Sequence, residues 1–196
     1  MNSEKSPRRG RLWVLMAAGL LWAAVAGSPR AGEGPSGEIP KGDHGAATMD
    51  FQLKEFSRLM PHADVSKPPA GFDPVVWEAF IPKDNALTPE RVALGKKLFF
   101  DTRLSADNTV SCATCHDVTR GFTDQRATSE GIKAQLGRRN APTTLNVVLL
   151  QSLFLDGRSP TLDHQARQPI VNPIEMGFPD GAAAVKAIEG DAEYQA

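Results

Sequence analysis

The chain has 196 residues, of which 41% are hydrophobic and 23% are charged, and its formal net charge is −1. This composition is that of an ordinary globular protein and excludes collagen-like and fully disordered chains. The nearly balanced charge argues against a nucleic-acid binder, which usually carries a basic face. Two cysteines are too few for a disulfide scaffold, and the length suits one domain with tails rather than two domains.

The first 26 residues have the pattern of a secretory signal peptide. Basic residues between Lys5 and Arg11 precede an apolar run over Leu12–Ala23, and Ala24–Ala26 has the small-x-small pattern of a cleavage site. An uncleaved anchor is the alternative, although the run is shorter than the ~20 apolar residues of a comfortable membrane span. We expect export to an oxidising compartment, most simply a bacterial periplasm, and no stable membrane span after cleavage.

Two segments separate this signal from the main domain. Residues 27–50 are rich in Gly, Pro, Ser and charge, which predicts a flexible linker because such a segment buries too little apolar surface to offset its ordering entropy. Residues 51–86 form a Pro-rich lead-in. Apolar residues from Phe51 to Met60 have helical spacing, and five prolines then break the chain into short pieces.

The remaining residues, 87–196, predict an all-α domain of short helices and long loops. A helix begins at Thr88, a good N-cap that is followed by proline. Further helices are predicted over 142–150, from Ser159 to about Gln168, and over 182–188, whereas strand patterns are nearly absent. Loops of this length are unusual in a compact domain, so we expect a large prosthetic group to organise them.

The sequence Cys-x-x-Cys-His at residues 112–116 predicts the attachment of a c-type haem. Two thiols three residues apart on one helical turn can each form a thioether to a haem vinyl group. The histidine that follows then places its imidazole under the iron. We therefore expect Cys112 and Cys115 to hold one covalent haem c and His116 to be its proximal ligand.

The two cysteines allow three other interpretations. A thioredoxin-like redox pair usually accompanies a βαβ pattern, which is not visible. A structural zinc site needs four ligands, and the chain has no second cysteine pair. A plain disulfide is the third alternative, and the export signal together with the adjacent His116 favours haem attachment over it.

The nature of the other axial position decides between two kinds of haem protein. A second protein ligand favours electron transfer, whereas an open site allows chemistry on a small molecule. His44 lies in the predicted linker, His62 in the Pro-rich lead-in, and His164 on the expected wet face of a helix. Met176 suits the Met ligand of a small cytochrome c better than Met60 does, and core packing is the alternative role for both.

Glu175 offers a different interpretation of the same face. It lies in the segment Asn172–Gly177, whose bordering turn formers predict a defined geometry. A carboxylate on the open face of a haem can move a proton between the two oxygens of bound peroxide, which is general acid–base catalysis. An isolated acidic loop residue is more often simply solvated, so the surrounding pattern has to decide.

Several ordered stretches supply that pattern: Leu94–Asp101, Arg103–Ser105, Ser111–Asp117, Gly121–Asp124, Arg139–Thr143, Asp156–Arg158 and Asn172–Gly177. Together they resemble the N-terminal haem domain of the bacterial dihaem cytochrome c peroxidases, a family that includes the MauG-type enzymes. The resemblance covers residues 87 to about 196 and implies a cytochrome c-like fold and a peroxidase-like oxidoreductase.

The resemblance also implies roles for individual residues. Cys112, Cys115 and His116 would hold the peroxidatic haem. Glu175 matches the distal glutamate that assists peroxide cleavage, and Gln165 matches a glutamine of the distal pocket.

A calcium ion and several partners are implied in the same way. Asn140 matches a residue at the calcium site between the two haem domains. The family reduces hydrogen peroxide to water in the periplasm with electrons from a small cytochrome c or a cupredoxin, and MauG-type members oxidise a partner protein instead.

The sequence departs from the family pattern in three ways. It holds no second Cys-x-x-Cys-His, and its last residues, 191–196, suggest the beginning of a helix, so we expect a truncated form without the second haem domain. Leu155 stands where many members have a tryptophan between the haems. Residues 126–139 contain no histidine to bind the iron before activation, so we expect a five-coordinate or water-bound haem that needs no reductive activation.

Two alternatives to the peroxidase interpretation stay open from the sequence. One is a monohaem electron carrier in which His116 and Met176 bind the iron. The other is a fragment that binds haem but is inactive because it lacks an electron entry domain.

Overall fold

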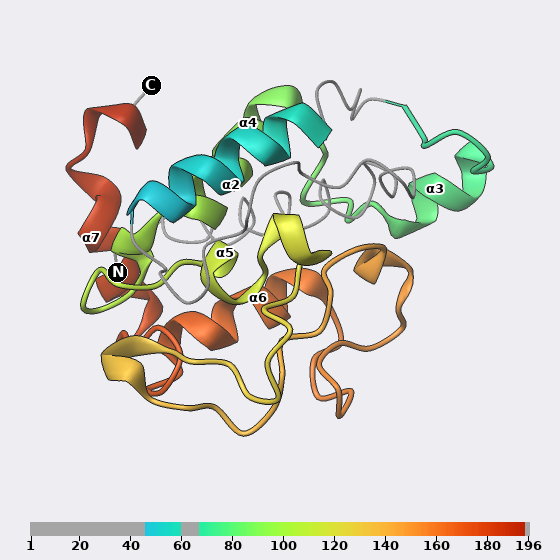
Figure 1. Ribbon diagram of the computed structural model, residues 1–196. Helices are drawn as coiled ribbons and strands as arrows, with labels where there is room; N and C mark the ends of the chain where they lie inside the picture. Colours follow the sequence, from blue (N-terminus) through green and yellow to red (C-terminus); the bar gives the residue numbers. More distant parts are fainter. Residues whose placement is uncertain (1–45, 60–66, 195–196) are drawn as a thin grey trace, which may run out of the picture.

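The computed structural model describes residues 46–59 and 67–194 (Figure 1). The predicted signal peptide at 1–26, most of the predicted linker, and the candidates His44, Met60 and His62 lie outside the described residues. In the part of the chain that is described, no helix is long and apolar enough to cross a membrane.

The regular elements of the described residues are helical, which confirms the expected all-α fold (Figure 1). The α-helices are α2 (Ala46–Leu59), α3 (Pro74–Phe80), α4 (Pro89–Phe100), α5 (Cys112–Cys115), α6 (Leu162–Val171) and α7 (Gly181–Glu189). Short 3₁₀ turns are η1 (Thr102–Leu104), η2 (Val118–Arg120), η3 (Ile132–Ala134), η4 (Val147–Leu149) and η5 (Ala192–Tyr194). Within these residues, strand-like pairing is limited to two isolated bridges.

Helices α4 and α7 form where the sequence predicts them. Thr88 caps α4 by accepting the amide hydrogen of Arg91 on its hydroxyl oxygen at 3.3 Å, and Pro89 occupies the first turn. Asp180 caps α7 in the same way by accepting from the amide of Ala183 at 2.8 Å. Both starts depend on local cap chemistry, which a sequence displays directly.

The helix predicted over 142–150 is wrong, because only the three residues of η4 are helical there. Asn146, which precedes them, has a left-handed backbone with φ of 59°. Leu149 and Leu150 are exposed, so no buried apolar face supports a longer helix.

The predicted helix start at Ser159 is also wrong. The backbone of Ser159 pairs with that of Leu153 in both directions, at 2.7 and 3.3 Å, and is therefore extended. Thr161 caps α6 instead by accepting from the amide of His164 at 3.3 Å. The helix continues past the predicted end at Gln168 to Val171.

Helix α2 begins at Ala46, inside the segment 27–50 that was expected to be a flexible linker, so that boundary is wrong for its last residues. The helical spacing expected after Phe51 is confirmed as far as Leu59. The pattern was missed before residue 51 because α2 gains its stability from packing on distant parts of the chain and not from its own composition.

Two apolar clusters form the core. The first joins α2 and α4 to the turn after α5, and its buried members are Met49, Phe56, Val92, Phe99, Ala113, Val118 and Phe122. The second joins α4 to α6 and α7, and its buried members are Leu98, Leu104, Val110, Ile132, Ile170, Met176, Ala184 and Ile188. The short helix α5 lies below α2 and α4 in Figure 1, with α6 beneath it.

Candidate haem-binding site

The two cysteines lie on the single turn of α5. The amide of Ser111 donates to the hydroxyl oxygen of Thr114 at 2.9 Å, which closes the start of this turn. Residues three apart on a helix are neighbours on one face, so the sulfurs of Cys112 and Cys115 lie on the same side. Both thiols are free, and no disulfide joins them.

Burial makes both thiols weaker acids than an ordinary cysteine. Burial raises the pKa of Cys112 to about 11. Burial raises the pKa of Cys115 to about 12, with the negative charges of Asp124 and Glu175 adding to the effect. A thioredoxin-like redox cysteine needs a lowered pKa, so these two thiols do not have the properties of such a pair.

His116 directly follows the cysteine turn and is oriented by a backbone carbonyl. Its Nδ1 lies 3.2 Å from the carbonyl oxygen of Phe122. Because a carbonyl only accepts, Nδ1 carries the proton in this contact. Burial lowers the pKa of His116, partly opposed by the carbonyls of Phe122 and Pro142 and by the charge of Asp124, so the neutral ring is favoured. This tautomer is the one in which a histidine binds a metal through Nε2.

Phe122 is a residue of this site that the sequence did not reveal. Its φ is +61°, in the left-handed region, although the side chain is bulky and almost fully buried. A phenylalanine in this conformation is strained, and the surrounding packing has to hold it there. Gly121 before it is also left-handed, with φ of 68°. No sequence pattern marks a strained phenylalanine, so this carbonyl became visible only in the structure.

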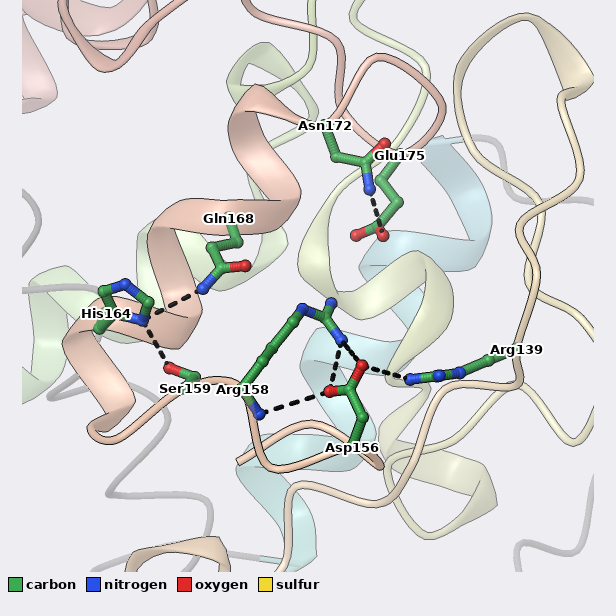
Figure 2. A network of polar contacts seen from close by, with 8 residues as sticks. All are labelled: Arg139, Asp156, Arg158, Ser159, His164, Gln168, Asn172 and Glu175. Carbon is green, nitrogen blue, oxygen red and sulfur yellow. Dashed lines mark hydrogen bonds and ion pairs between the residues drawn. The ribbon is translucent and has the colours of Figure 1, made fainter. Parts of the chain in front are cut away.

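Glu175 lies on a tight turn that Asn172 organises (Figure 2). The side-chain amide nitrogen of Asn172 donates to Oε1 of Glu175 at 2.8 Å, and its Oδ1 accepts from the amide of Ile174 at 3.0 Å. The backbone carbonyl of Asn172 accepts from the amides of Glu175 and Gly177, at 3.2 and 2.8 Å. The defined geometry that the turn formers predicted is therefore confirmed, and Asn172 is the residue that provides it.

The loop after the haem motif passes against this turn. The amide of Ile132 donates to the carbonyl of Glu175 at 3.0 Å. At Gly131 a Cβ atom would lie 2.0 Å from the carbonyl oxygen of Ile174 and 2.8 Å from the Cα of Glu175. Only glycine permits this approach. Because the neighbouring carbonyl of Glu130 lies 3.7 Å from the sulfur of Cys115, the loop connects the cysteine turn to the Glu175 turn.

A charged network lies next to Glu175 (Figure 2). Asp156 binds Arg139 and Arg158, each at 2.8 Å. The guanidinium of Arg158 also stacks on the ring of Phe154, 3.5 Å from its centroid. Burial raises the pKa of Glu175, and the charge of Arg158 and the hydrogen bond from Asn172 oppose this rise.

The other predicted site residues are placed as follows. Gln165 is half-buried on α6, two turns before Asn172 and on the same helix face. Asn140 is exposed, and within residues 46–59 and 67–194 no three His, Cys, Asp or Glu side chains gather as they would around a metal ion. Met176 is buried in the second core cluster, which fits packing rather than iron ligation. His164 is exposed, as expected.

The donor set fits a c-type haem. Two free thiols lie three residues apart on one helical turn, and the next residue is a histidine whose Nδ1 is anchored by the carbonyl of Phe122. The sequence profile of the di-haem cytochrome c peroxidase family matches residues 89–196. The chain belongs to this family.

Relatives and solved structures agree with this assignment. The cytochrome c peroxidase Ccp of Escherichia coli is 42% identical over 59% of this chain and 25% of its own length. The cytochrome c551 peroxidase of Pseudomonas aeruginosa is 39% identical over 63% of this chain and 36% of its own. For the methylamine utilization protein MauG of Methylorubrum extorquens the identity is 47%, over 50% of this chain and 28% of that protein.

Two crystal structures are similar as well. One is of a MauG-like protein associated with microbial copper homeostasis, with 37% identity and a TM-score of 0.55 over 59% of this chain and 34% of that one. The other is of the diheme peroxidase BthA from Burkholderia thailandensis, with 32% identity and a TM-score of 0.52 over 55% and 31% of the two chains. The chain spans a quarter to about a third of the length of the curated relatives it matches.

Proposed function

We propose that residues 87–196 form the haem domain of a peroxidase that reduces hydrogen peroxide to water. The observation that carries this proposal is the half-buried carboxylate of Glu175, which Asn172 holds in one orientation close to α5, the turn that carries the two cysteines. A carboxylate with a raised pKa is suited to accept a proton and return it. A residue that only contributed to solubility would have no need of such a turn.

The haem would supply the iron that binds peroxide and the electrons that break its O–O bond. Cys112 and Cys115 would attach the haem, and His116 would bind its iron. Glu175 takes a proton from the near oxygen of peroxide on one of its Oε atoms and delivers it to the far oxygen. The overall reaction consumes two protons and two electrons for each hydrogen peroxide and yields two waters, and the two electrons from the donor protein would replace those that the haem supplied. Gln165, half-buried on α6, would contribute to the peroxide-binding side, as the resemblance to the family implies.

The electrons come from a small redox protein, a cytochrome c or a cupredoxin, and the location is the periplasm. Asn140 contributes to a calcium site, for which an exposed side-chain carbonyl is a suitable ligand. Because residues 126–139 contain no histidine, the chain offers no ligand there that reductive activation would have to remove, and the iron would be left open to water or peroxide.

The alternative function, an electron carrier with Met176 on the iron, is disfavoured by the packing of that side chain. Met176 is 4% exposed and lies among the residues of the second cluster. A ferric EPR spectrum separates the two. A high-spin signal that changes rapidly with peroxide supports the peroxidase, and a low-spin Met-ligated signal that peroxide leaves unchanged supports the carrier.

Substitution of Glu175 tests the proposed proton transfer. In the haem-loaded chain, Glu175→Gln should slow the reaction with hydrogen peroxide by about 10²- to 10⁴-fold, the range for a lost general acid–base group. Stopped-flow absorbance in the Soret region measures this rate, and mass spectrometry checks that haem is still attached.

Glu189→Gln, at an exposed carboxylate on α7, is the matched control and should react at the wild-type rate. An unchanged rate in Glu175→Gln would exclude Glu175 from the chemistry.

A further inference from the structure

Helix α2 lies outside the part of the chain that the family profile matches, yet it packs directly on the haem-binding turn. The hydroxyl of Ser111 donates to the sulfur of Met49 at 3.4 Å. The amide of Val118 donates to Oε1 of Gln52 at 3.3 Å. Ser111 directly precedes the Cys-x-x-Cys-His motif and Val118 follows it by two residues, so α2 contacts the motif at both ends.

Phe56 makes the third contact of α2 with this region. Its ring is 3% exposed and lies edge-on to the rings of Phe100 and Phe122, with centroids 5.6 and 6.1 Å away. The amino group of Lys96 lies 4.9 Å from the Phe56 ring centroid and donates to the hydroxyl of Ser57 at 3.0 Å. Phe56 is therefore fixed between α4 and the turn that follows the haem motif.

The contact between the rings of Phe56 and Phe122 matters because the backbone of Phe122 orients His116. Its left-handed conformation directs the carbonyl to Nδ1 of His116. Its amide donates to the carbonyl of Asp117 at 2.8 Å, which closes the turn around the histidine. A strained residue keeps such a conformation only while its surroundings hold it, and the ring of Phe56 is one of those surroundings.

We propose that α2 is a positioning element for the proximal histidine: Phe56 holds Phe122 so that its carbonyl keeps His116 in the Nδ1-protonated, correctly oriented form. This inference rests on the proposed role of His116 as the haem ligand. It gives α2, which precedes the peroxidase domain, a role in the properties of the haem iron. That role is to set how strongly the imidazole donates electrons to the iron. A hydrogen bond from Nδ1 to a carbonyl raises the basicity of the ligand.

The test is Phe56→Ala in the full chain with haem attached. Without the ring, Phe122 relaxes and the hydrogen bond to His116 weakens. The iron–histidine stretching band in the resonance Raman spectrum of the reduced protein should then move to lower frequency. The haem reduction potential should rise, because a weaker donor stabilises ferric iron less, and the reaction with peroxide should slow about tenfold.

Three variants separate positioning from simple loss of stability. Leu53→Ala removes the same kind of volume from the exposed face of α2 and should change neither the band nor the potential. Phe56→Leu keeps most of the side-chain volume, so its iron–histidine band and its reduction potential should lie between those of the wild type and those of Phe56→Ala. Ile188→Ala, in the second core cluster, should lower the melting temperature without moving the potential.

The outcomes distinguish this inference from the proposed function. If His116→Ala leaves the ferric spectrum unchanged, His116 is not the ligand and both proposals fail. If His116→Ala changes the spectrum but Phe56→Ala leaves the potential and the band at their wild-type values, α2 is only a structural support and this inference alone is overturned.

Discussion

The two sides of the haem-binding turn are held by different forces. On the His116 side, buried rings and one backbone carbonyl determine the position of the imidazole. On the Glu175 side, the side-chain amide of Asn172 and a network of charged side chains surround the carboxylate. The side chains of Asp156 and Arg158 in this network are 37% and 43% exposed. Apolar packing responds to lost volume and little to salt, whereas exposed charges respond to salt and pH. The His116 imidazole is thus held by packing, whereas Glu175 is held by interactions that respond to salt and pH.

The largest effect should come from removing volume on the His116 side. Phe122→Ala should lower the free energy of unfolding by about 3–5 kcal/mol, because it deletes a buried ring from the first cluster. Phe122→Leu keeps most of the volume and should cost less than about 1.5 kcal/mol. Urea unfolding at two salt concentrations measures both. A loss that shrinks strongly in high salt would contradict the apolar character of this side.

The next effect should come from the amide that orients Glu175. Asn172→Asp keeps the oxygen that accepts from Ile174 but turns a carboxylate oxygen toward Glu175. Loss of a hydrogen bond to a charged group costs about 1.5–3 kcal/mol, so the reaction with peroxide should slow about 10- to 100-fold. Stopped-flow mixing measures the rate. Asn108→Asp, at an exposed asparagine, serves as the control, and equal rates in the two variants would show that Asn172 does not orient the carboxylate.

The smallest effect should be a shift in pH dependence when Arg158 is removed. Its positive charge lowers the pKa of Glu175, so Arg158→Gln should raise that pKa. Glu175 must be ionised to take the peroxide proton, and the acidic limb of the pH–rate profile should therefore move to higher pH. Exposed charge pairs contribute at most about 1 kcal/mol, which limits the shift to about 0.7 pH unit.

High salt provides the check on this charge effect. At about 1 M salt the profiles of the wild type and Arg158→Gln should converge, because exposed charges are then screened. A shift to lower pH would show that the guanidinium does not act on Glu175 by its charge.

Local chemistry explains which elements could be predicted. The starts of α4 and α7 follow from capping side chains a few residues away, and α5 follows from the spacing of its cysteines. The helix expected over 142–150 failed because Leu149 and Leu150 are exposed and give a longer helix no buried apolar face. The start of α6 was misplaced because Ser159 pairs with Leu153, a contact that the capping pattern does not contain.

The candidate site shows the same contrast between features that a local sequence pattern predicts and features that only the fold reveals. Its candidate reactive residues, Cys112, Cys115, His116 and Glu175, could be named from motif spacing and from the resemblance to the family, and their roles stay predictions. The residues that orient them could not. Phe122 acts through a left-handed backbone, and Gly131 acts through the approach of a loop more than forty residues away in sequence.

The sequence by itself determined the family, the all-α character and the haem-binding turn, because each depends on residue types at short, fixed separations. Only the tertiary structure decided that α2 packs on this turn, that a strained carbonyl orients His116, and that Arg158 lies beside Glu175. The contacts of α2 and of Arg158 join residues that are distant in the chain, and the Phe122 carbonyl depends on a left-handed backbone that packing has to hold; neither leaves a local pattern in the sequence.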